Sequence, residues 1–361
     1  MNAILERPVS GHLPELLTQR LPRPNGEGSV IYVNTEGESR VLPKGRLVRL
    51  FPKETLWVLN DAAVLPAALW VEVEGGGTRI ELRIASLNDE SGDFSAIGFG
   101  SGNYQVQTEQ RGPVQQLPVG ARLRSAAGVR FEVLGQSGRL FELRCAGGYR
   151  RLLHALYASG APIQYAYTSR AHQLSEVQNS YVGRPWAIEP ASAGRHLSAS
   201  VLSALQEAGQ HLAWLTHAAG ISSTGDAALD ALLPFPERYE IPEATMAAVS
   251  AARERGSLIV AVGSSTTRAL EAAALPGGAL QHGSGLASLR LHADYEPQVV
   301  DVLLTGIHEA GSSHRELTRA FASDGALDAA WQLAAAHDLK LHEFGDAMLI
   351  GRRDVGSAAH G

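Results

Sequence analysis

Hydrophobic and polar residues follow two different spacings along the chain, and the changes between them divide it into three parts. Up to about Val71 the sequence holds two short apolar runs, Val30–Val33 and Leu56–Leu59, in otherwise loop-like sequence. The second run leads directly into Asn60-Asp61, residue types that favour a turn. We therefore predict two strands here, the second ending at the Asn-Asp turn.

Between Glu72 and Arg151 apolar and charged residues alternate with a period of two. The alternation is clear in Thr78–Ile84, Val129–Leu134 and Arg139–Leu143, and glycines separate these runs. A period of two places apolar side chains on one face of a strand and charges on the other, while glycine permits tight turns. This part is predicted to form a small antiparallel β domain.

After Arg151 helical and strand patterns alternate, which indicates α/β layering with crossover helices. Ser198 is placed to cap the first helix, and Ser313 with Glu316 forms a capping box for a later one. The predicted helices are Ala199–Ala208, Glu243–Arg255, a stretch from Gly263–Thr266 to Ala274, one from Ser313 to about Phe321, and Ala326–His337. The predicted strands are His211–Leu215, Ser257–Val262, Val299–Thr305 and one near Ala347–Ile350.

Composition limits the class of protein. The chain has 361 residues, of which 45% are hydrophobic, and it carries 31 Lys+Arg against 37 Asp+Glu, a net charge of −6. These values exclude general disorder, and the length predicts two domains with a sizeable core. Apolar runs such as Leu258–Val262 are far shorter than the ~20 residues of a membrane span, so we expect no membrane partner.

The cysteine content and the N-terminal segment both favour the cytoplasm. Cys145 is the single cysteine, so no disulfide can form within the chain, which suits a reducing compartment. Residues 1–15 lack the basic stretch and apolar core of a signal peptide. We therefore expect a cytoplasmic protein.

The β-rich part is locally basic. Between Arg111 and Arg151 there are eight arginines and two acidic residues, Glu132 and Glu142. This pattern fits a solvated sheet face, and it also fits a surface that contacts RNA phosphates. The choice depends on whether the arginines share one face of the domain.

The strongest local motif lies where a buried strand meets a helix. In Ala261–Arg268 the strand ends at Gly263, and small hydroxyl residues occupy the start of the next helix. A helix N-terminus offers unpaired N–H groups and a partial positive charge that can hold a carboxylate or phosphate, and Arg268 can add a charged contact. The alternative is an ordinary helix cap followed by an exposed arginine.

Three histidines, His196, His217 and His308, lie at or beside the ends of predicted elements. Ligands of α/β folds gather at the carboxyl ends of strands, and imidazole can act there as a general acid or base. The alternative for each is a structural histidine. No two histidines are four residues apart and cysteine is nearly absent, so no metal is assigned.

A Gly-Asp turn, Gly345-Asp346, enters the last predicted strand and is either a plain turn or part of a site. The sequence holds no Gly-Lys-Ser/Thr phosphate loop, no dinucleotide-binding glycine fingerprint after a strand and no nucleophile elbow. Function must therefore be inferred from the combination of motifs.

Taken together, the motifs resemble one family over nearly the whole chain. The segments concerned are, in order, Asn60-Asp61 with Val64 and Pro66-Ala67, Gln178, Ser192–His196, His217, Glu237 with Tyr239–Pro242, Ala261–Glu271, Val300–Thr305 with His308, and Gly345–Ile350. In order and spacing they are similar to the S-adenosylmethionine:tRNA ribosyltransferase-isomerases of queuosine biosynthesis. The resemblance implies a mixed-sheet or barrel-like α/β main domain, formed by 1–71 and 152–361 and interrupted by a smaller antiparallel β-barrel-like domain at 72–151.

The family resemblance also implies a reaction. The family uses S-adenosylmethionine as a ribosyl donor to 7-aminomethyl-7-deazaguanine at the tRNA wobble position, and the products are epoxyqueuosine, adenine and methionine. On this basis the expected catalytic residues are His217, His308, His196 and Asp346. The residues expected to bind substrate are Asn60, Asp61, Gln178, Ser192, Ala193, Gly194, Glu237, Ser264, Ser265, Thr266, Arg268, Asp301, Thr305 and Gly345.

The chain departs from the family pattern at several polar and glycine positions. Ala68 stands where the family has arginine, and residues 218–223, 232–235, 293–295 and 306–310 also differ. These changes indicate that the donor site is retained while the acceptor differs.

Three hypotheses therefore stay open: the tRNA-modifying enzyme, a diverged enzyme that uses the same donor on a small-molecule acceptor, and a non-catalytic paralogue that binds nucleoside or RNA. We expect S-adenosylmethionine as co-substrate and a monomeric protein without metal.

Overall fold

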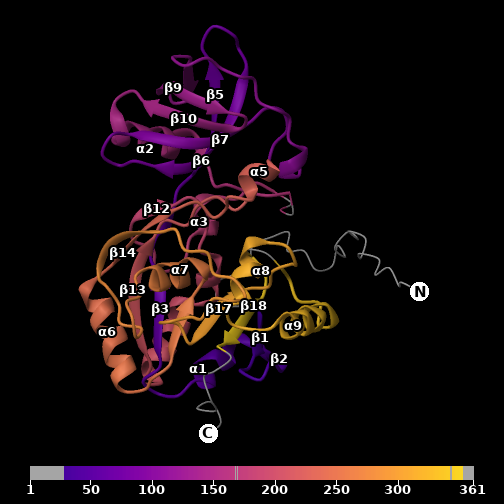
Figure 1. The fold of residues 1–361 in the computed structure, drawn as a ribbon. Helices are drawn as coiled ribbons and strands as arrows, with labels where there is room; N and C mark the ends of the chain where they lie inside the picture. Colours follow the sequence, from indigo (N-terminus) through magenta and orange to yellow (C-terminus); the bar gives the residue numbers. More distant parts are fainter. Residues whose placement is uncertain (1–27, 167, 169, 342–343, 353–361) are drawn as a thin grey trace.

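The computed structural model describes residues 28–166, 168, 170–341 and 344–352. Within this part the chain forms a large α/β unit and a smaller β unit, which lie at opposite ends of the molecule in Figure 1. The N-terminal segment for which we expect no signal peptide lies outside the described residues. None of the helices within the described part is long and apolar enough to cross a membrane.

The α/β unit is built on a nine-stranded sheet. In spatial order its strands are β16 (Gly283–Ala287), β14 (Glu237–Ile241), β13 (His211–His217), β3 (Leu56–Asn60), β15 (Ile259–Val262), β17 (Val302–Gly306), β18 (Ala347–Gly351), β1 (Ser29–Val33) and β2 (Ser39–Pro43). The central strands β13, β3, β15 and β17 are parallel, and the neighbours β14 and β18 run antiparallel to them. The carboxyl ends of the four central strands therefore meet at one edge of the sheet.

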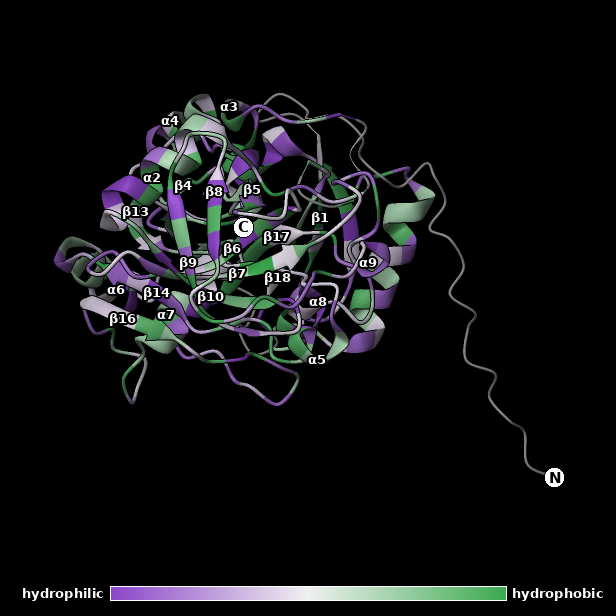
Figure 2. Cartoon of the chain, turned by 90° about the horizontal axis from the view of Figure 1, so that it is seen from above, coloured by the Kyte–Doolittle hydropathy of each residue, from purple (hydrophilic) through white to green (hydrophobic). Residues whose placement is uncertain are grey.

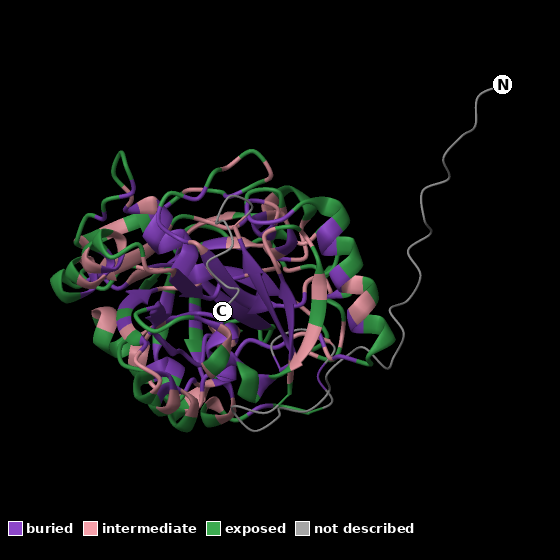
Figure 3. Ribbon diagram, turned by 90° about the horizontal axis from the view of Figure 1, so that it is seen from below, coloured by how far each residue is buried: buried purple, intermediate pink, exposed green. Residues whose placement is uncertain are grey.

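Both faces of this sheet are buried, which explains the continuous apolar runs of its strands. In β3, Leu56 and Val58 face one core, whereas Trp57 and Leu59 face the other. The first core is covered by α6 (Glu243–Glu254), α7 (Ser264–Ala272), α8 (Ser313–Thr318) and α9 (Asp324–Ala336), and the second by α1 (Leu47–Leu50) and α4 (Ala199–Glu207). Figure 3 shows buried residues at the centre of the sheet and exposed residues on the surrounding helices.

The second unit is a closed antiparallel barrel. Its sheet has the order β11 (Gly160–Ala161), β5 (Ala68–Val73), β6 (Arg79–Leu87), β7 (Asp93–Phe99), β10 (Leu140–Cys145), β9 (Arg130–Ser137) and β8 (Arg122–Ser125). Pairing of β5 with β8 closes six of these strands into a barrel, with β11 added outside the ring. Helix α2 (Gly148–Ser159) packs its buried face against the barrel core. The predicted fold class, a mixed-sheet α/β domain with a smaller antiparallel barrel, is confirmed.

The barrel unit extends beyond the predicted insert 72–151 at both ends. β5 begins at Ala68, and the predicted boundary at Arg151 falls inside α2. The sequence pattern hid both features, because β5 continues from the preceding segment without a turn and α2 follows two glycines that resemble a loop. The division of the main domain into 1–71 and 152–361 stays a prediction.

Two helix starts also differ from the prediction. Ser312, and not Ser313, caps α8, because its hydroxyl accepts a hydrogen bond from the Arg315 N–H. Helix α9 begins at Asp324 with Ser323 as its cap. The remaining strands and α-helices of the described part are β4 (Ala63–Val64), β12 (Pro185–Ala187), α3 (Leu174–Val177) and α5 (Ala227–Asp230), and short 3-10 helices lie at Lys44–Arg46, Thr108–Gln110 and Ser192–His196.

A small apolar cluster joins the two units. Ile97 and Phe99 of β7 pack with Ile221 and Leu233, which belong to the connection between β13 and β14. In Figure 2, viewed from above, the barrel strands β6, β7 and β10 project over the central part of the large sheet. The barrel therefore rests on loops at the carboxyl edge of the large sheet.

Five arginines of the barrel lie in two separate places. On the outer face, three arginines form ion pairs with acids of neighbouring strands: Arg124 with Glu72, Arg130 with Glu74 and Arg144 with Asp93. Arg111 and Arg139 instead lie at the junction with the α/β unit, where their guanidinium groups are 4.9 Å from the ring centre of Phe99 in the apolar cluster. The positive charge predicted for this stretch is thus divided between two places and partly neutralised.

Candidate active site

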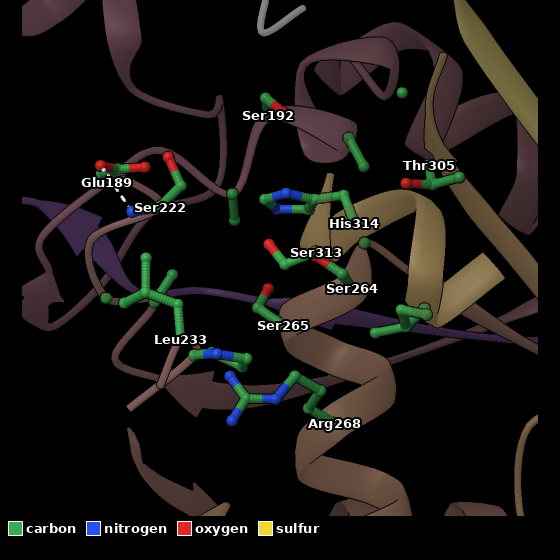
Figure 4. A pocket seen from close by; sticks show the side chains of 18 of the residues that line it. Glu189, Ser192, Ser222, Leu233, Ser264, Ser265, Arg268, Thr305, Ser313 and His314 are labelled. Atoms are coloured by element: carbon green, nitrogen blue, oxygen red, sulfur yellow. Dashed lines mark hydrogen bonds between the residues drawn. The ribbon is translucent and has the colours of Figure 1, made fainter. Parts of the chain in front are cut away.

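A cavity of about 220 Å³ lies at the carboxyl ends of β15 and β17, between the starts of α7 and α8 and two loops that follow β12 and β13. Figure 4 shows its wall, with Glu189 and Ser222 on one side and Ser264, Ser313 and His314 on the other. Eight of the predicted site residues line it: Ser192, Ala193, Glu237, Ser264, Ser265, Arg268, Thr305 and His308. The expectation that ligands bind at the carboxyl ends of strands therefore identified residues that are far apart in the sequence and close together in the structure.

The turn from β15 into α7 forms one wall. Gly263 has φ of +96°, a conformation that glycine adopts without a side-chain clash, so the chain reverses within one residue. No side chain caps α7 at this residue, and Ser264 and Ser265 line the cavity at the start of the helix. The first N–H groups of a helix have no partner in the helix and carry partial positive charge. The hydroxyl of Thr266, by contrast, donates to the Val262 carbonyl and is buried.

Arg268 and Glu237 form a buried ion pair in the wall. The Arg268 guanidinium donates to the Glu237 carboxylate and also to the Ala287 carbonyl, at 2.7 Å. The Gly220 N–H donates to the same carboxylate. Burial nevertheless raises the pKa of Glu237 to about 7, against the lowering effect of Arg268. Near neutral pH this carboxyl group can therefore release or accept a proton.

His217 lies behind this ion pair and does not line the cavity. Its Nε2 is 3.3 Å from Glu237, and the side chain is fully buried. Burial lowers the pKa of His217 to about 3, so the ring is neutral at pH 7. The Asn60 side chain holds the His217 backbone by accepting from its N–H and donating to its carbonyl, both at 2.9 Å. His217 therefore lies directly behind Glu237.

His308 lines the cavity together with a second histidine, His314. Its Nε2 is 2.9 Å from the Thr305 hydroxyl, and its ring stacks on His314 with 4.8 Å between ring centres. Burial lowers the pKa of His314, and Arg268 adds to this effect. Sequence reasoning missed His314, although it follows the Ser312-Ser313 helix start directly.

Other predicted residues support the site from outside the cavity. Gln178 accepts from the Val64 N–H and donates to the Val64 carbonyl, both at 2.9 Å, which fixes the chain after β3. Asp61 accepts from the Thr216 hydroxyl at 2.6 Å.

His196 and Gly194 lie in the turn Ser192–His196 and are buried. A side chain at Gly194 would overlap the Tyr181 hydroxyl, so glycine allows this turn to pack closely. Neither residue is among those that line the cavity. They hold the turn whose first residues, Ser192 and Ala193, do line it.

Asp346 and Gly345 form a structural turn before β18. The Asp346 carboxylate accepts from the Ser29 N–H at 2.7 Å and from the Lys340 N–H at 2.8 Å. A side chain at Gly345 would overlap the Lys340 carbonyl. These contacts join the starts of β1 and β18 to the loop before them, and neither residue is among those that line the cavity.

Asp301 lies at the opposite edge of the sheet. Its carboxylate accepts from the Ile259 N–H at 2.9 Å, at the start of β15, whereas the cavity is at the end of that strand. Asp301 is not among the residues that line the cavity, so we expect a structural role for it rather than contact with substrate. Asp301 precedes β17, whereas the cavity lies where β15 and β17 end.

We expect Asp301→Ala to lower the free energy of unfolding by about 1–3 kcal/mol, because the buried Ile259 N–H loses its acceptor. The KM for each substrate should stay as in the wild type, since the residue is remote from the cavity. Urea unfolding and steady-state kinetics measure the two effects. A changed KM at unchanged stability would contradict this assignment.

Glu189 was not predicted, yet its carboxylate lines the cavity. The Tyr165 hydroxyl and the Ser222 N–H both donate to it, the latter at 3.0 Å. Nothing in the local sequence singles it out, because its partners come from segments far from it in the chain. Among the described residues, no group of three or more His, Cys, Asp or Glu side chains is arranged to hold a metal ion.

The raised pKa of Glu237 predicts a pH-dependent stability. Its value rises from 4.5 to about 7 on folding, so the folded state binds this proton more tightly. The resulting stabilisation is fully present below about pH 4.5 and is lost as the pH rises to about 7. We expect Glu237→Gln to remove this part of the pH dependence in urea unfolding. The exposed Glu243→Gln should keep the wild-type slope, and an unchanged slope in Glu237→Gln would disprove the assignment.

Comparison with known proteins defines the family. The model of a family described as "Queuosine biosynthesis protein" matches residues 12–350. The chain belongs to this family. It is 29% identical to an S-adenosylmethionine:tRNA ribosyltransferase-isomerase of Trichlorobacter lovleyi, over 96% of this chain and 100% of the relative. A protein of the same name from Aromatoleum aromaticum is 32% identical, over 83% of this chain and 84% of the relative.

A solved structure supports the fold. A crystal structure of an S-adenosylmethionine tRNA ribosyltransferase from Thermotoga maritima matches with a TM-score of 0.50 and 22% identity. The match covers 94% of this chain and 98% of that chain. The family predicted from the order of short motifs is thus confirmed, and with it membership of a family of enzymes.

Proposed function

We propose that the protein transfers the ribosyl group of S-adenosylmethionine to 7-aminomethyl-7-deazaguanine in tRNA, and isomerises it to give epoxyqueuosine, adenine and methionine. The observation that carries the proposal is the cavity at the carboxyl edge, which combines a helix N-terminus, a histidine pair and the Arg268–Glu237 ion pair. The relatives that match nearly the whole chain bear the name of this activity, which favours tRNA over a small-molecule acceptor.

The start of α7 is suited to the amino-acid end of the donor. Ser264 and Ser265 line the cavity, and the helix N-terminus favours a carboxylate. Arg268 was expected to contact this carboxylate, but its guanidinium is already bound to Glu237 and to the Ala287 carbonyl. Its role in the proposal is to hold Glu237 in place.

The reaction needs a base and an acid. The sulfonium acidifies the hydrogens on the adjacent 5′ carbon, and His308 is the base we assign to remove one, because it lines the cavity. Departing adenine needs a proton, and Glu237, with a pKa of about 7, is the acid we assign to supply it. His217 carries no second proton at pH 7, so we assign it the positioning of Glu237.

Incubation with S-adenosylmethionine tests the proposal, with adenine release measured by chromatography. We expect release with tRNA that carries the deazaguanine precursor and none with unmodified tRNA. Release with a small-molecule acceptor alone would overturn the tRNA assignment, and donor binding without release would indicate a non-catalytic paralogue. We expect the active protein to be a cytoplasmic monomer, and the buried Cys145 suits that compartment.

A further inference from the structure

Glu189 lies in the wall of the cavity and is held there from two sides. The residue is 8% exposed and lines the cavity. Its carboxylate accepts from the Tyr165 hydroxyl and from the Ser222 N–H, at 3.0 Å for the latter. The Ser222 hydroxyl in turn donates to the Tyr165 oxygen at 3.1 Å. Two donors therefore fix the orientation of one carboxylate.

The barrel adds to this rigidity. The Arg83 guanidinium lies 5.3 Å from the centre of the Tyr165 ring, and it is itself paired with Glu81 at 2.9 Å. The N–H of Ile188 donates to the Ala219 carbonyl at 2.8 Å, which ties the Glu189 segment to the loop that follows β13. A carboxylate fixed in this way loses little side-chain entropy when it binds a ligand.

The charge of Glu189 acts on the rest of the cavity. It is one of the groups that raise the pKa of Glu237, after burial as the main cause. Two carboxyl groups, those of Glu189 and Glu237, therefore lie in the wall of one cavity. A ligand with an ammonium group near Glu189 would relieve this repulsion, and charge-assisted hydrogen bonds to carboxylates are among the strongest.

The position of Glu189 indicates which cationic group of the two substrates it can bind. Figure 4 shows Glu189 on the wall opposite Ser264, where the proposed function places the donor carboxylate. In an amino acid the carboxylate and the ammonium group share one carbon atom, so the donor ammonium stays near α7. The sulfonium has no N–H to donate. The remaining candidate is the aminomethyl group of the acceptor.

We infer that Glu189 binds the aminomethyl group of the acceptor base in its ammonium form, accepts its proton before the nitrogen attacks the donor, and so selects an acceptor with a primary amine. This inference rests on the proposed function of the cavity. It makes Glu189 a specificity-determining residue whose partners, Tyr165 and Ser222, set its orientation. It also assigns a role to the loop that follows β12, for which the sequence motifs predicted none.

Two RNA probes test the inference without turnover. They are anticodon stem-loops whose wobble base is 7-aminomethyl-7-deazaguanine or the uncharged 7-methyl-7-deazaguanine, with Kd measured by fluorescence anisotropy. The wild type should bind the aminomethyl RNA about tenfold to a hundredfold more tightly, as expected for one charged hydrogen bond. Glu189→Gln should bind both probes equally, and Tyr165→Phe should show an intermediate ratio. Glu240→Gln, a surface residue paired with Arg184, is the matched control and should keep the wild-type ratio.

Kinetics separate this inference from the proposed function. In Glu189→Gln the KM for the aminomethyl RNA should rise by the same factor, with the KM for S-adenosylmethionine unchanged. Three results would each overturn the inference. They are a rise in the KM for S-adenosylmethionine in Glu189→Gln, a Kd ratio between the two RNAs in Glu189→Gln that equals the wild-type ratio, and equal Kd values of the wild type for the two RNAs. Absence of adenine release by the wild type would overturn the proposed function, and the binding ratio would still decide what Glu189 binds.

Discussion

His308→Ala is expected to slow adenine release strongly, with a loss of about 10²–10⁴-fold in kcat, the usual contribution of a general base. The reason is that His308 lines the cavity and is oriented by the Thr305 hydroxyl at 2.9 Å and by stacking on His314. The fold should persist, because the residue is only partly buried and follows the end of β17. Chromatographic assay of adenine and circular dichroism measure the two properties.

His211→Ala is the control for this experiment. His211 lies at the start of β13, where its half-exposed ring pairs with Glu54 at 3.0 Å, remote from the cavity at the other end of the strands. It should release adenine at the wild-type rate. Turnover by His308→Ala equal to that of His211→Ala would remove His308 from the mechanism.

Arg268→Ala is expected to lower the free energy of unfolding by about 3–5 kcal/mol, because it leaves the buried Glu237 carboxylate without its cation. Activity should fall as well, since Glu237 would lose its orientation. The double variant Arg268→Ala/Glu237→Gln should recover part of the stability, because no isolated buried charge remains. Urea unfolding at pH 8 gives the three values.

An exposed ion pair provides the comparison. Arg319 pairs with Glu316 and Asp324 at the surface, and Arg319→Ala should lower stability by less than about 1 kcal/mol. If Arg268→Ala were equally mild, or if the double variant were less stable than Arg268→Ala, the Arg268–Glu237 pair would not be the structural unit described here.

The sequence predicted the large sheet well because both of its faces are buried, so its strands are continuous apolar runs such as Ile259–Val262. Strand ends then indicated the edge where Gly263 and His308 meet. Local patterns were weaker for the barrel, whose closure depends on pairing between β5 and β8. The sequence of neither strand indicates that β5 and β8 pair. Alternating apolar and charged residues are equally compatible with an open sheet.

The site was only partly predicted, because contacts between distant segments also determine which residues line it. His217 is the last residue of β13, but it is fully buried next to Glu237, and such burial depends on tertiary contacts. Glu189 and His314 gain their importance from contacts with segments remote in the sequence. Their own neighbours in the chain form no motif.

The apolar cluster between the two units has a consequence for how such proteins can diversify. Ile221 and Leu233 line the cavity on one side and pack against Ile97 and Phe99 of the barrel on the other. The barrel therefore cannot be exchanged independently of the active site. Replacing it with the barrel of a relative would change the shape of the cavity, and deleting it would remove the residues that pack behind one wall of the cavity. Changes of acceptor and changes of barrel sequence should have evolved together in this lineage.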